Sequence, residues 1–299
     1  MVTAAIETDG LTRVFGQTMA LDGLSLRIEE GEIFGFLGPN GAGKSTTIRI
    51  LLDLIRPTAG AARVLGFDCQ RETLEVRRRV GYLPGDLRLY GGLTGRKTVE
   101  LFAGLRGGMD EAFVCELAGE MGLDLEKRAS AYSKGNRQKL GVLLALLGRP
   151  PVLLLDEPTS GLDPLVQRTV WGVLRREAER GATVFFSSHV MSEVEQTCER
   201  VGILRAGKLV AVEPVVAMKA RARRHIEVDF VGDAPPPDAV RVAGSREVRR
   251  ERGSIEFELT GEIDALLKAL AGYQVADLRT EQPTLDEILL SYYREEVAG

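Results

Sequence analysis

The sequence predicts an α/β protein: a mainly parallel sheet with a helical insertion, preceded by an antiparallel β-subdomain and followed by a small α+β domain. Short, continuous apolar runs at 33–37, 152–155 and 183–187 are typical of strands that are covered on both faces. Helical periodicity follows two of these runs, at 45–55 and 164–180, as crossover connections between parallel strands require. After about residue 214 this pattern ends.

The remaining elements are expected in the following order. Strands at 4–14 and 24–29 precede the first apolar run, and a further strand lies at 80–83. A helical subdomain spans about residues 86–148, with helices at 96–105, 110–121 and 137–147. Beyond residue 225 we expect strands at 226–231, 246–250, 254–259 and 275–279, and helices at 261–271 and 284–293. The chain is therefore expected to form two domains, at 1–214 and 215–299.

Composition describes a globular protein and argues against several classes. Hydrophobic residues make up 44% and charged residues 27% of the 299 residues, close to the averages of soluble domains. The net charge of −4 gives no sign of a nucleic-acid-binding protein, which is usually basic. Cys69, Cys115 and Cys198 form no metal-binding spacing and fit a reducing, cytosolic compartment. The start of the chain lacks the apolar stretch of a signal peptide, and the most apolar tract, 141–155, falls short of the roughly 20 residues that span a bilayer.

A glycine-rich loop follows the apolar run at 33–37 and opens the next helix. Such glycines let backbone N–H groups turn toward a β-phosphate, while the helix directs its positive N-terminal end at the same anion. Lys44 is expected to reach the β- and γ-phosphates, and the Ser45 hydroxyl to ligate Mg²⁺. The phosphate-binding P-loop pattern is matched in full, and its candidate binding residues are Gly38, Pro39, Asn40, Gly41, Ala42, Gly43, Lys44, Ser45 and Thr46.

Two carboxylates and a histidine follow the later apolar strands. Asp156 closes one strand beside the P-loop and is the expected second Mg²⁺ partner. Glu157, one residue further, is placed to polarise the attacking water as a general base. His189 ends the strand at 183–188, whose carboxyl end should point at the same nucleotide crevice. A contact between His189 and the γ-phosphate is one hypothesis, and a structural or merely exposed histidine is the other.

Together these residues resemble the nucleotide-binding domain of ATP-binding cassette (ABC) transporters. Residues 156–159 and 160–163 are similar to that family's second phosphate motif and its adjoining aspartate loop, and His189 falls on its switch histidine. Residues 132–138, Tyr-Ser-Lys-Gly-Asn-Arg-Gln, resemble the family signature, which lies at a helix N-terminus. The order of these motifs is very specific, and the resemblance covers residues 4–214, which it identifies as an ABC-type ATP-binding domain.

The resemblance implies further site residues and a dimer. Phe15 matches the aromatic residue that stacks on adenine, although a core position is the alternative. Ser133, Gly135 and Asp163 are implied to bind ATP that is held by the opposite subunit of a head-to-tail dimer. Catalysis is implied to depend on Glu157, His189 and Lys44.

Two positions depart from the family pattern. Lys134 replaces a signature glycine, so its side chain either points away from the phosphate or adds charge to it. Gly85 stands where the family carries the glutamine of its glutamine loop. Because glycine has no side chain to ligate Mg²⁺, either Asp86 substitutes or water completes the metal shell.

The resemblance implies an ATP- and Mg²⁺-dependent ATPase that energises a separate transmembrane permease, with a second nucleotide-binding subunit and no nucleic-acid partner. The expected location is the cytoplasmic face of the membrane. The signature variant and the ending at 282–290 resemble the drug- and antibiotic-exporter branch, which implies export of a drug, antibiotic, lipid or similar amphipathic compound. The alternative is a soluble ABC-type ATPase that acts on ribosomes or DNA. Residues 225–299 carry no site motif, and packing or dimer contact is preferred to ligand sensing there.

Overall fold

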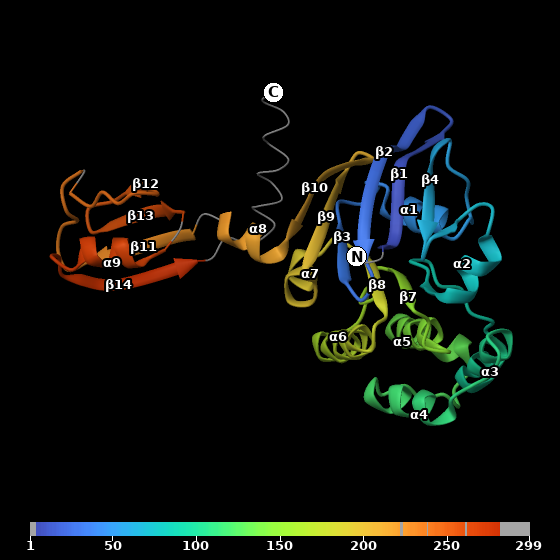
Figure 1. The fold of residues 1–299 in the computed structure, drawn as a ribbon. Coiled ribbons are helices and arrows are strands. Elements are labelled where there is room, and N and C mark those ends of the chain that lie inside the picture. The colour runs from blue at the N-terminus through green and yellow to red at the C-terminus, as the bar shows by residue number, and fades with distance from the viewer. Residues whose placement is uncertain (1–3, 222–223, 238, 261, 282–299) are drawn as a thin grey trace. The chain divides into compact units, whose positions relative to one another are not determined.

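The computed structural model describes residues 4–221, 224–237, 239–260 and 262–281. Its internal contacts divide the chain into two compact units, Met1–Val212 and Glu213–Gly299, which are described separately below. Figure 1 shows the helices and strands of both. None of the helices within the described residues combines the length and the apolar character needed to cross a bilayer.

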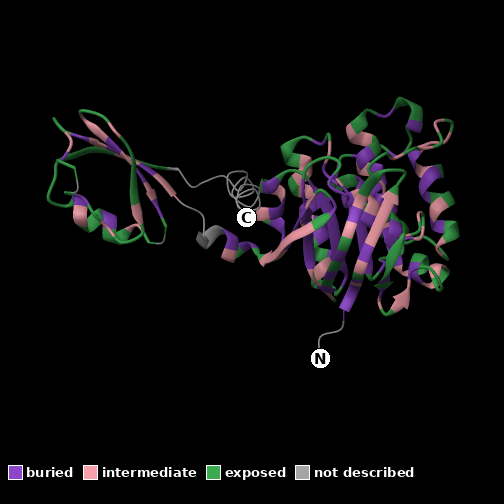
Figure 2. Ribbon diagram, turned by 90° about the horizontal axis from the view of Figure 1, so that it is seen from above, coloured by how far each residue is buried: buried purple, intermediate pink, exposed green. Residues whose placement is uncertain are grey.

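The first unit is built on a six-stranded sheet. Its strand order is β10-β9-β3-β8-β7-β6, and the five strands from β9 to β6 run parallel. Every residue of β3, β7 and β8 is buried, as the continuous apolar runs predicted, and Figure 2 shows this buried centre. The predicted mixed α/β fold with a mainly parallel sheet is therefore confirmed. The strands are β6 (Val80–Leu83), β7 (Val152–Asp156), β8 (Thr183–Ser188), β3 (Ile33–Leu37), β9 (Arg200–Arg205) and β10 (Lys208–Pro214).

One face of this sheet packs against α1 (Lys44–Leu51) and a four-stranded sheet of order β2-β1-β4-β5. The predicted antiparallel β-subdomain is this second sheet, in which β1 pairs antiparallel with β2 and with β4, and β4 with β5. A single hydrophobic core joins Ile48 of α1 to Phe34 and Leu154 of the parallel sheet and to Leu26 of β2. The strands are β1 (Ala4–Phe15), β2 (Thr18–Glu29), β4 (Ala59–Val64) and β5 (Phe67–Asp68), and α2 (Thr73–Arg79) connects β5 to β6.

The opposite face of the parallel sheet is covered by α5 (Lys134–Leu146) and α6 (Pro164–Glu179). Trp171 of α6 packs on Phe186 of β8 with ring centroids 4.7 Å apart. The helical insertion adds α3 (Gly95–Leu105) and α4 (Glu111–Glu120), both in contact with α5. In Figure 1 these helices lie on the side of β7 and β8 away from β1 and β2. The sheet thus separates α1 from α5.

Helix boundaries differ from the expectations at two points that matter for the site. The first helix ends at Leu51 rather than residue 55, because Asp53 adopts a left-handed conformation with φ 50°. The signature helix starts at Lys134 rather than residue 137, because the Ser133 hydroxyl caps it by accepting from the Asn136 N–H at 3.2 Å. Short elements that the sequence did not reveal include α2, α7 (Met191–Thr197), β4, β5, β9 and β10.

The second unit is a four-stranded antiparallel sheet of order β12-β13-β11-β14 with α9. Buried residues alternate along β11 and β13, so one face forms a hydrophobic core with Leu266 and Leu270 of α9. The predicted helix at 284–293 lies outside the described residues. The elements are α8 (Val215–Arg221), β11 (Arg224–Phe230), β12 (Ser245–Arg250), β13 (Ser254–Leu259), α9 (Asp264–Leu270) and β14 (Val275–Glu281).

Candidate ATP site

The glycine-rich loop connects the end of β3 to the start of α1. Its backbone requires glycine at Gly43, where φ is 111° and a Cβ would lie 2.5 Å from the Ala20 carbonyl oxygen. Gly41 also has a positive φ of 81° and lies where no atom would meet a Cβ. These conformations turn the loop around the N-terminus of α1, whose free N–H groups and dipole favour an anion. The loop therefore has the local geometry of a phosphate cradle.

Lys44 lies at this loop with most of its side chain buried. Its Nζ donates to the carbonyl oxygens of Gly38 and of Pro39, the latter at 3.1 Å. Burial lowers the pKa of Lys44, and the carboxylates of Glu157 and Asp156 partly oppose this effect. A cation in this position balances the negative charge of the carboxylates and can also balance the negative charge of phosphate oxygens.

Asp156 ends β7 and is held by the neighbouring strand. The buried Ser187 hydroxyl of β8 donates to Asp156 Oδ1 at 2.5 Å. On the other side, a Cβ added to Gly85 would lie 3.0 Å from Asp156 Oδ2, so the Gly85 backbone passes close to the carboxylate. Asp86, the alternative oxygen donor in this loop, is 74% exposed and pairs with Arg88 at 3.1 Å.

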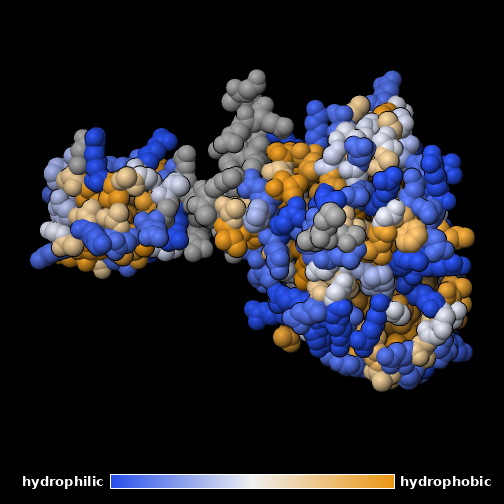
Figure 3. Space-filling view, viewed as in Figure 1, coloured by the Kyte–Doolittle hydropathy of each residue, from blue (hydrophilic) through white to orange (hydrophobic). Residues whose placement is uncertain are grey.

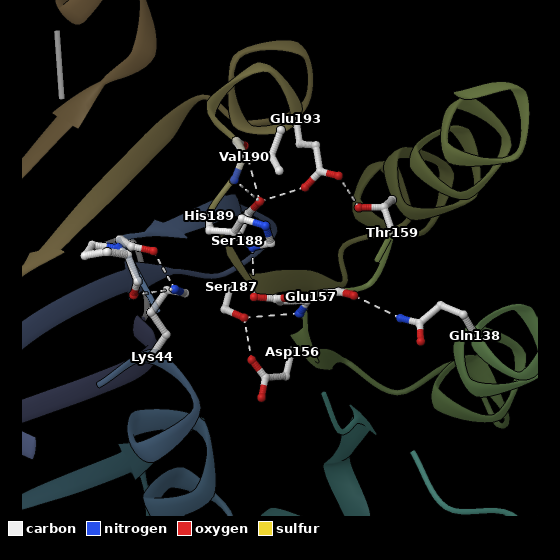
Figure 4. Close-up of polar contacts among 12 residues, drawn as sticks. Lys44, Gln138, Asp156, Glu157, Thr159, Ser187, Ser188, His189, Val190 and Glu193 are labelled. Atoms are coloured by element: carbon white, nitrogen blue, oxygen red, sulfur yellow. Dashed lines mark hydrogen bonds and ion pairs between the residues drawn. The ribbon is translucent and has the colours of Figure 1, made fainter. Parts of the chain in front are cut away.

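Glu157 starts the turn after β7 in a left-handed conformation, with φ 52°. A non-glycine residue there has an unfavourable backbone that surrounding contacts must hold. Its N–H donates to the Ser187 carbonyl oxygen at 3.2 Å, and Gln138 Nε2 of α5 donates to the carbonyl oxygens of Glu157 and Pro158 at 2.9 and 3.0 Å. The Glu157 carboxylate contacts His189, with Oε1 2.9 Å from Nδ1. Figure 4 shows these side chains together at the carboxyl ends of β7 and β8.

The signature residues lie at the start of α5, across the sheet from α1. Ser133 is the N-terminal cap of α5. A Cβ on Gly135 would lie 3.2 Å from the Gly161 carbonyl oxygen, and the aliphatic part of Lys134 packs against Gly161. Asp163 caps α6 by accepting from the Leu165 and Val166 N–H groups at 3.1 and 3.0 Å. The signature residues at the start of α5 therefore lie next to the aspartate loop at 160–163.

Phe15 lies at the end of β1 with 44% of its surface exposed. The Arg13 guanidinium lies over its ring, 4.3 Å from the centroid. Such exposure does not fit a core position, so the ring is available for stacking on at least part of its surface.

Three buried or half-buried residues of the site receive no role of their own from the sequence, although the first of them ends the signature motif: Gln138, Ser187 and Glu193. Each acts through contacts with residues 19 to 34 positions away in the chain. One local signal existed, since Ser187 and Ser188 place two hydroxyls at the end of an otherwise apolar strand.

Comparison with known proteins shows the family to which the chain belongs. The ABC transporter family model matches residues 21–160. The bacitracin transport ATP-binding protein BcrA of Bacillus licheniformis is 38% identical over 229 residues, which cover 76% of this chain and 75% of that protein. The daunorubicin resistance ATP-binding protein DrrA3 of Streptomyces coeruleorubidus is 34% identical over 306 residues, covering 97% of this chain and 96% of that protein.

Solved structures show the same fold. The structure of an ATP-binding subunit of an ABC transporter superposes with a TM-score of 0.66 at 29% identity, covering 72% of this chain and 92% of that chain. The dimeric, post-hydrolysis structure of the ATP-binding cassette MJ0796 with ADP and Pi gives a TM-score of 0.64 at 26% identity, covering 70% and 98%. Within this family, cassettes work with a transmembrane permease and dimerise. The chain therefore belongs to the ABC transporter family as an ATP-binding subunit, an ATPase that energises transport by a separate permease.

Proposed function

We propose that the chain powers export of a drug, antibiotic, lipid or similar amphipathic compound from the cytoplasmic face of the membrane. The observation that carries this proposal is the near full-length similarity to a daunorubicin resistance protein, which extends through the second unit. Similarity to a bacitracin transport protein supports the same branch. These transport relatives do not favour the alternative of an ATPase that acts on ribosomes or DNA.

In the proposed site, the loop from Gly38 to Thr46 binds the phosphates of ATP and Lys44 compensates their charge. Phe15 stacks on adenine with the face that Arg13 leaves free. The Glu157 carboxylate accepts a proton from the attacking water, and His189 contacts both Glu157 and the γ-phosphate. The 2.9 Å contact between Glu157 and His189 supports this pairing.

The site also fits Mg²⁺. This cation prefers oxygen ligands and usually binds through one or two carboxylates plus substrate phosphates. Ser45 and Asp156 offer a hydroxyl and a carboxylate, and the side of Asp156 Oδ2 that Gly85 approaches would have no room for a glutamine side chain without a shift. When bound, the ion would neutralise charge on the β- and γ-phosphates. Because Asp86 is exposed and paired with Arg88, we propose that water rather than Asp86 takes the place of the family's glutamine.

We further propose that two copies of this chain form the ATP sites between them. The sheet lies between α1 and α5, which supports a site in which the signature at the start of α5 serves the P-loop of another copy. A second copy placed head to tail would bring its Ser133, Gly135 and Asp163 to the γ-phosphate. Each nucleotide would then connect two chains.

A groove of about 560 Å³ in the first unit is the proposed contact with the permease. Leu74 and Leu105 line it and are 67% and 79% exposed. Figure 3 shows hydrophobic and hydrophilic surface side by side along the edge that α2 and α3 form. The remaining lining residues are Arg77, Arg78, Arg79, Arg106, Leu147, Gly148, Pro150 and Pro151.

Charge indicates the chemistry of the segment that this groove accepts. Burial lowers the pKa of Arg106, whose guanidinium donates to the carbonyl oxygens of Val80 and Leu147 at 2.7 and 3.4 Å. Within the described residues no carboxylate pairs with Arg106. A permease segment that carries acidic residues and one or two apolar side chains would pair with the arginines of the groove and cover its exposed leucines. Val80 starts β6, which leads to Gly85 beside Asp156, so the groove is connected to the ATP site through a single strand.

The test is transport in cells that lack their own exporters for the compound. The chain is expressed with a transmembrane permease that co-purifies with it, and daunorubicin efflux is measured. We expect efflux with the wild-type chain, none with Glu157→Gln, and loss of permease binding with Leu105→Asp, which opposes an acidic segment. The control Leu101→Asp alters another exposed leucine of α3 outside the groove. Efflux that is equal with Glu157→Gln would overturn the proposed function, and equal permease binding by Leu105→Asp would overturn the docking surface.

A further inference from the structure

Glu193 of α7 connects the two loops that carry Glu157 and His189. Its Oε1 accepts a hydrogen bond from the Thr159 hydroxyl, and its Oε2 accepts one from the Ser188 hydroxyl at 2.7 Å. Thr159 belongs to the turn after β7, and Ser188 is the last residue of β8. One carboxylate therefore binds both loops, as Figure 4 shows.

The Ser188 hydroxyl has a single proton and two acceptors within reach, Glu193 Oε2 at 2.7 Å and the Val190 carbonyl oxygen at 3.2 Å, and the shorter, charge-assisted bond to Glu193 is the stronger. The Ser188 oxygen also accepts from the Val190 N–H at 2.9 Å, which fixes the chain on the far side of His189. Thr159 and Ser188 are only 1% and 2% exposed. If Glu193 were absent, the buried Thr159 hydroxyl would lose this partner, which is costly, and the Ser188 hydroxyl would turn to the Val190 carbonyl oxygen and no longer be tied to α7.

These contacts close a ring around the catalytic pair. Thr159 lies two residues after Glu157, and Ser188 directly precedes His189. Glu157 Oε1 and His189 Nδ1 meet at 2.9 Å on the other side of the ring. The relative position of the two side chains thus depends on how firmly Thr159 and Ser188 are held.

The turn also needs support because of its backbone. Glu157 has φ 52°, a conformation that is unfavourable for a non-glycine residue. Gln138 holds the carbonyl groups of this turn from α5, and Glu193 holds Thr159 from α7. Contacts from two helices on different sides keep a strained turn in one position.

We propose that Glu193 is a positioning residue of the ATPase, which sets the Glu157 carboxylate against His189 by binding Thr159 and Ser188. The inference rests on the proposed role of Glu157 as general base. Since the hydrogen bonds of Glu193 within the described residues go to Thr159 and Ser188 and not to the P-loop, its loss should act on turnover rather than on ATP binding.

The experiment measures ATP turnover and ATP affinity of the full-length chain for Glu193→Ala, Glu193→Gln and Thr159→Val. Displacing a catalytic group by about 1 Å costs on the order of 100-fold in rate, so Glu193→Ala should lower kcat by about 10- to 100-fold. The KM for ATP should stay within about threefold. Glu193→Gln keeps one acceptor oxygen, and Thr159→Val removes one of the two hydrogen bonds, so both should lie between wild type and Glu193→Ala. The matched control is Ser192→Ala, which removes an exposed hydroxyl from the adjacent position of α7.

A double variant separates positioning from a general loss of structure. His189→Ala already breaks the catalytic pair, so adding Glu193→Ala should lower kcat little further. If the two substitutions acted independently, their fold-losses in kcat would multiply. A kcat within threefold of wild type for Glu193→Ala, or fully multiplicative losses in the double variant, would overturn the inference. If Glu193→Ala fails to fold, Glu193→Gln and Thr159→Val decide by the same criteria. Glu157→Gln is measured in parallel: its retained turnover would instead reject the role of Glu157 itself.

Discussion

Lys44 keeps its ammonium group at the P-loop although burial lowers its pKa. The loop carbonyls of Gly38 and Pro39 hold Nζ where a phosphate would replace them as partner. Removing this charge with Lys44→Ala should weaken ATP binding by the value of a charge-assisted contact, about 1.5–3 kcal/mol or roughly 10- to 150-fold in Kd. Titration with a fluorescent ATP analogue measures this, and an unchanged midpoint would contradict the P-loop role.

The Glu157 carboxylate should be needed for turnover but not for binding. Glu157→Gln keeps the shape and removes the proton acceptor, so we expect turnover to fall about 100-fold or more with ATP still bound. Phosphate release and ATP binding, measured on the same preparation, separate the two effects. Turnover within threefold of wild type would exclude Glu157 as the base.

Residues that act through a local motif could be identified from the sequence, and residues that act through a distant contact could not. Several candidate site residues follow strands, and their motifs occur in a recognisable order in the sequence: the P-loop, Asp156, Glu157 and His189. Ser187 and Gln138 support the same turn from β8 and α5, and only the folded chain brings them there. The sequence shows that Gly85 replaces the family's glutamine, but only the packing of the folded chain brings Gly85 close to Asp156.

The start of α1 depends on two glycines that should respond differently to substitution. A methyl group at Gly43 would meet the Ala20 carbonyl oxygen at 2.5 Å, whereas at Gly41 it would meet nothing within 4 Å. Gly41→Ala should therefore lower the free energy of unfolding only by the strain of a left-handed backbone at alanine, about 1–2 kcal/mol. Gly43→Ala should cost more, about 3 kcal/mol, because overpacking adds to that strain. Urea unfolding of both variants measures the difference, and equal losses would mean that the contact with Ala20 is relieved at no cost.

Long, strongly patterned elements were predictable, and short or small-residue elements were not. Strands β3, β7 and β8 are continuous apolar runs and were expected from that pattern alone. By contrast, β4 has the sequence AGAARV and becomes a strand through its pairing with β1. Helices α2 and α7 have seven residues each, too few for a periodicity to be read. The early start of α5 follows from the Ser133 cap, a contact of one side chain.

The two units have separate hydrophobic cores, so a defect in one core should remain there. Phe257 is 1% exposed within the core of the second unit. Phe257→Ala should destabilise that unit by about 3–5 kcal/mol and leave ATP binding at the P-loop unchanged. Hydrogen exchange resolved by region, together with ATP titration, tests this. Loss of ATP binding in a chain whose first unit is still protected would show that the units depend on each other.

At the scale of the assembly, the decisive question is which chain supplies the signature to which P-loop. The parallel sheet lies between α1 and α5 within a chain, and the proposed composite site takes its P-loop from one copy and its signature from the other. Cross-linking tests this with chains that carry one added cysteine each, either Asn40→Cys or Ser133→Cys, in a Cys115→Ser background because Cys115 is exposed while Cys69 and Cys198 are buried. Including Glu157→Gln should hold the ATP-bound state.

Mixing the two single-cysteine chains with ATP and a short thiol cross-linker should give a product that contains one copy of each. Neither chain alone should give a dimer, because a head-to-tail arrangement places unlike positions together and keeps like positions apart. Without ATP the mixed product should disappear, since the nucleotide supplies the contact between the two half-sites. A second experiment uses a chain that carries both added cysteines. If its cross-links form only within single chains, each P-loop is completed by the signature of its own chain, and the proposed composite site is wrong. If instead they join two chains, and do so only with ATP, then hydrolysis of the γ-phosphate removes that contact and lets the chains separate, which is the motion that a permease can use.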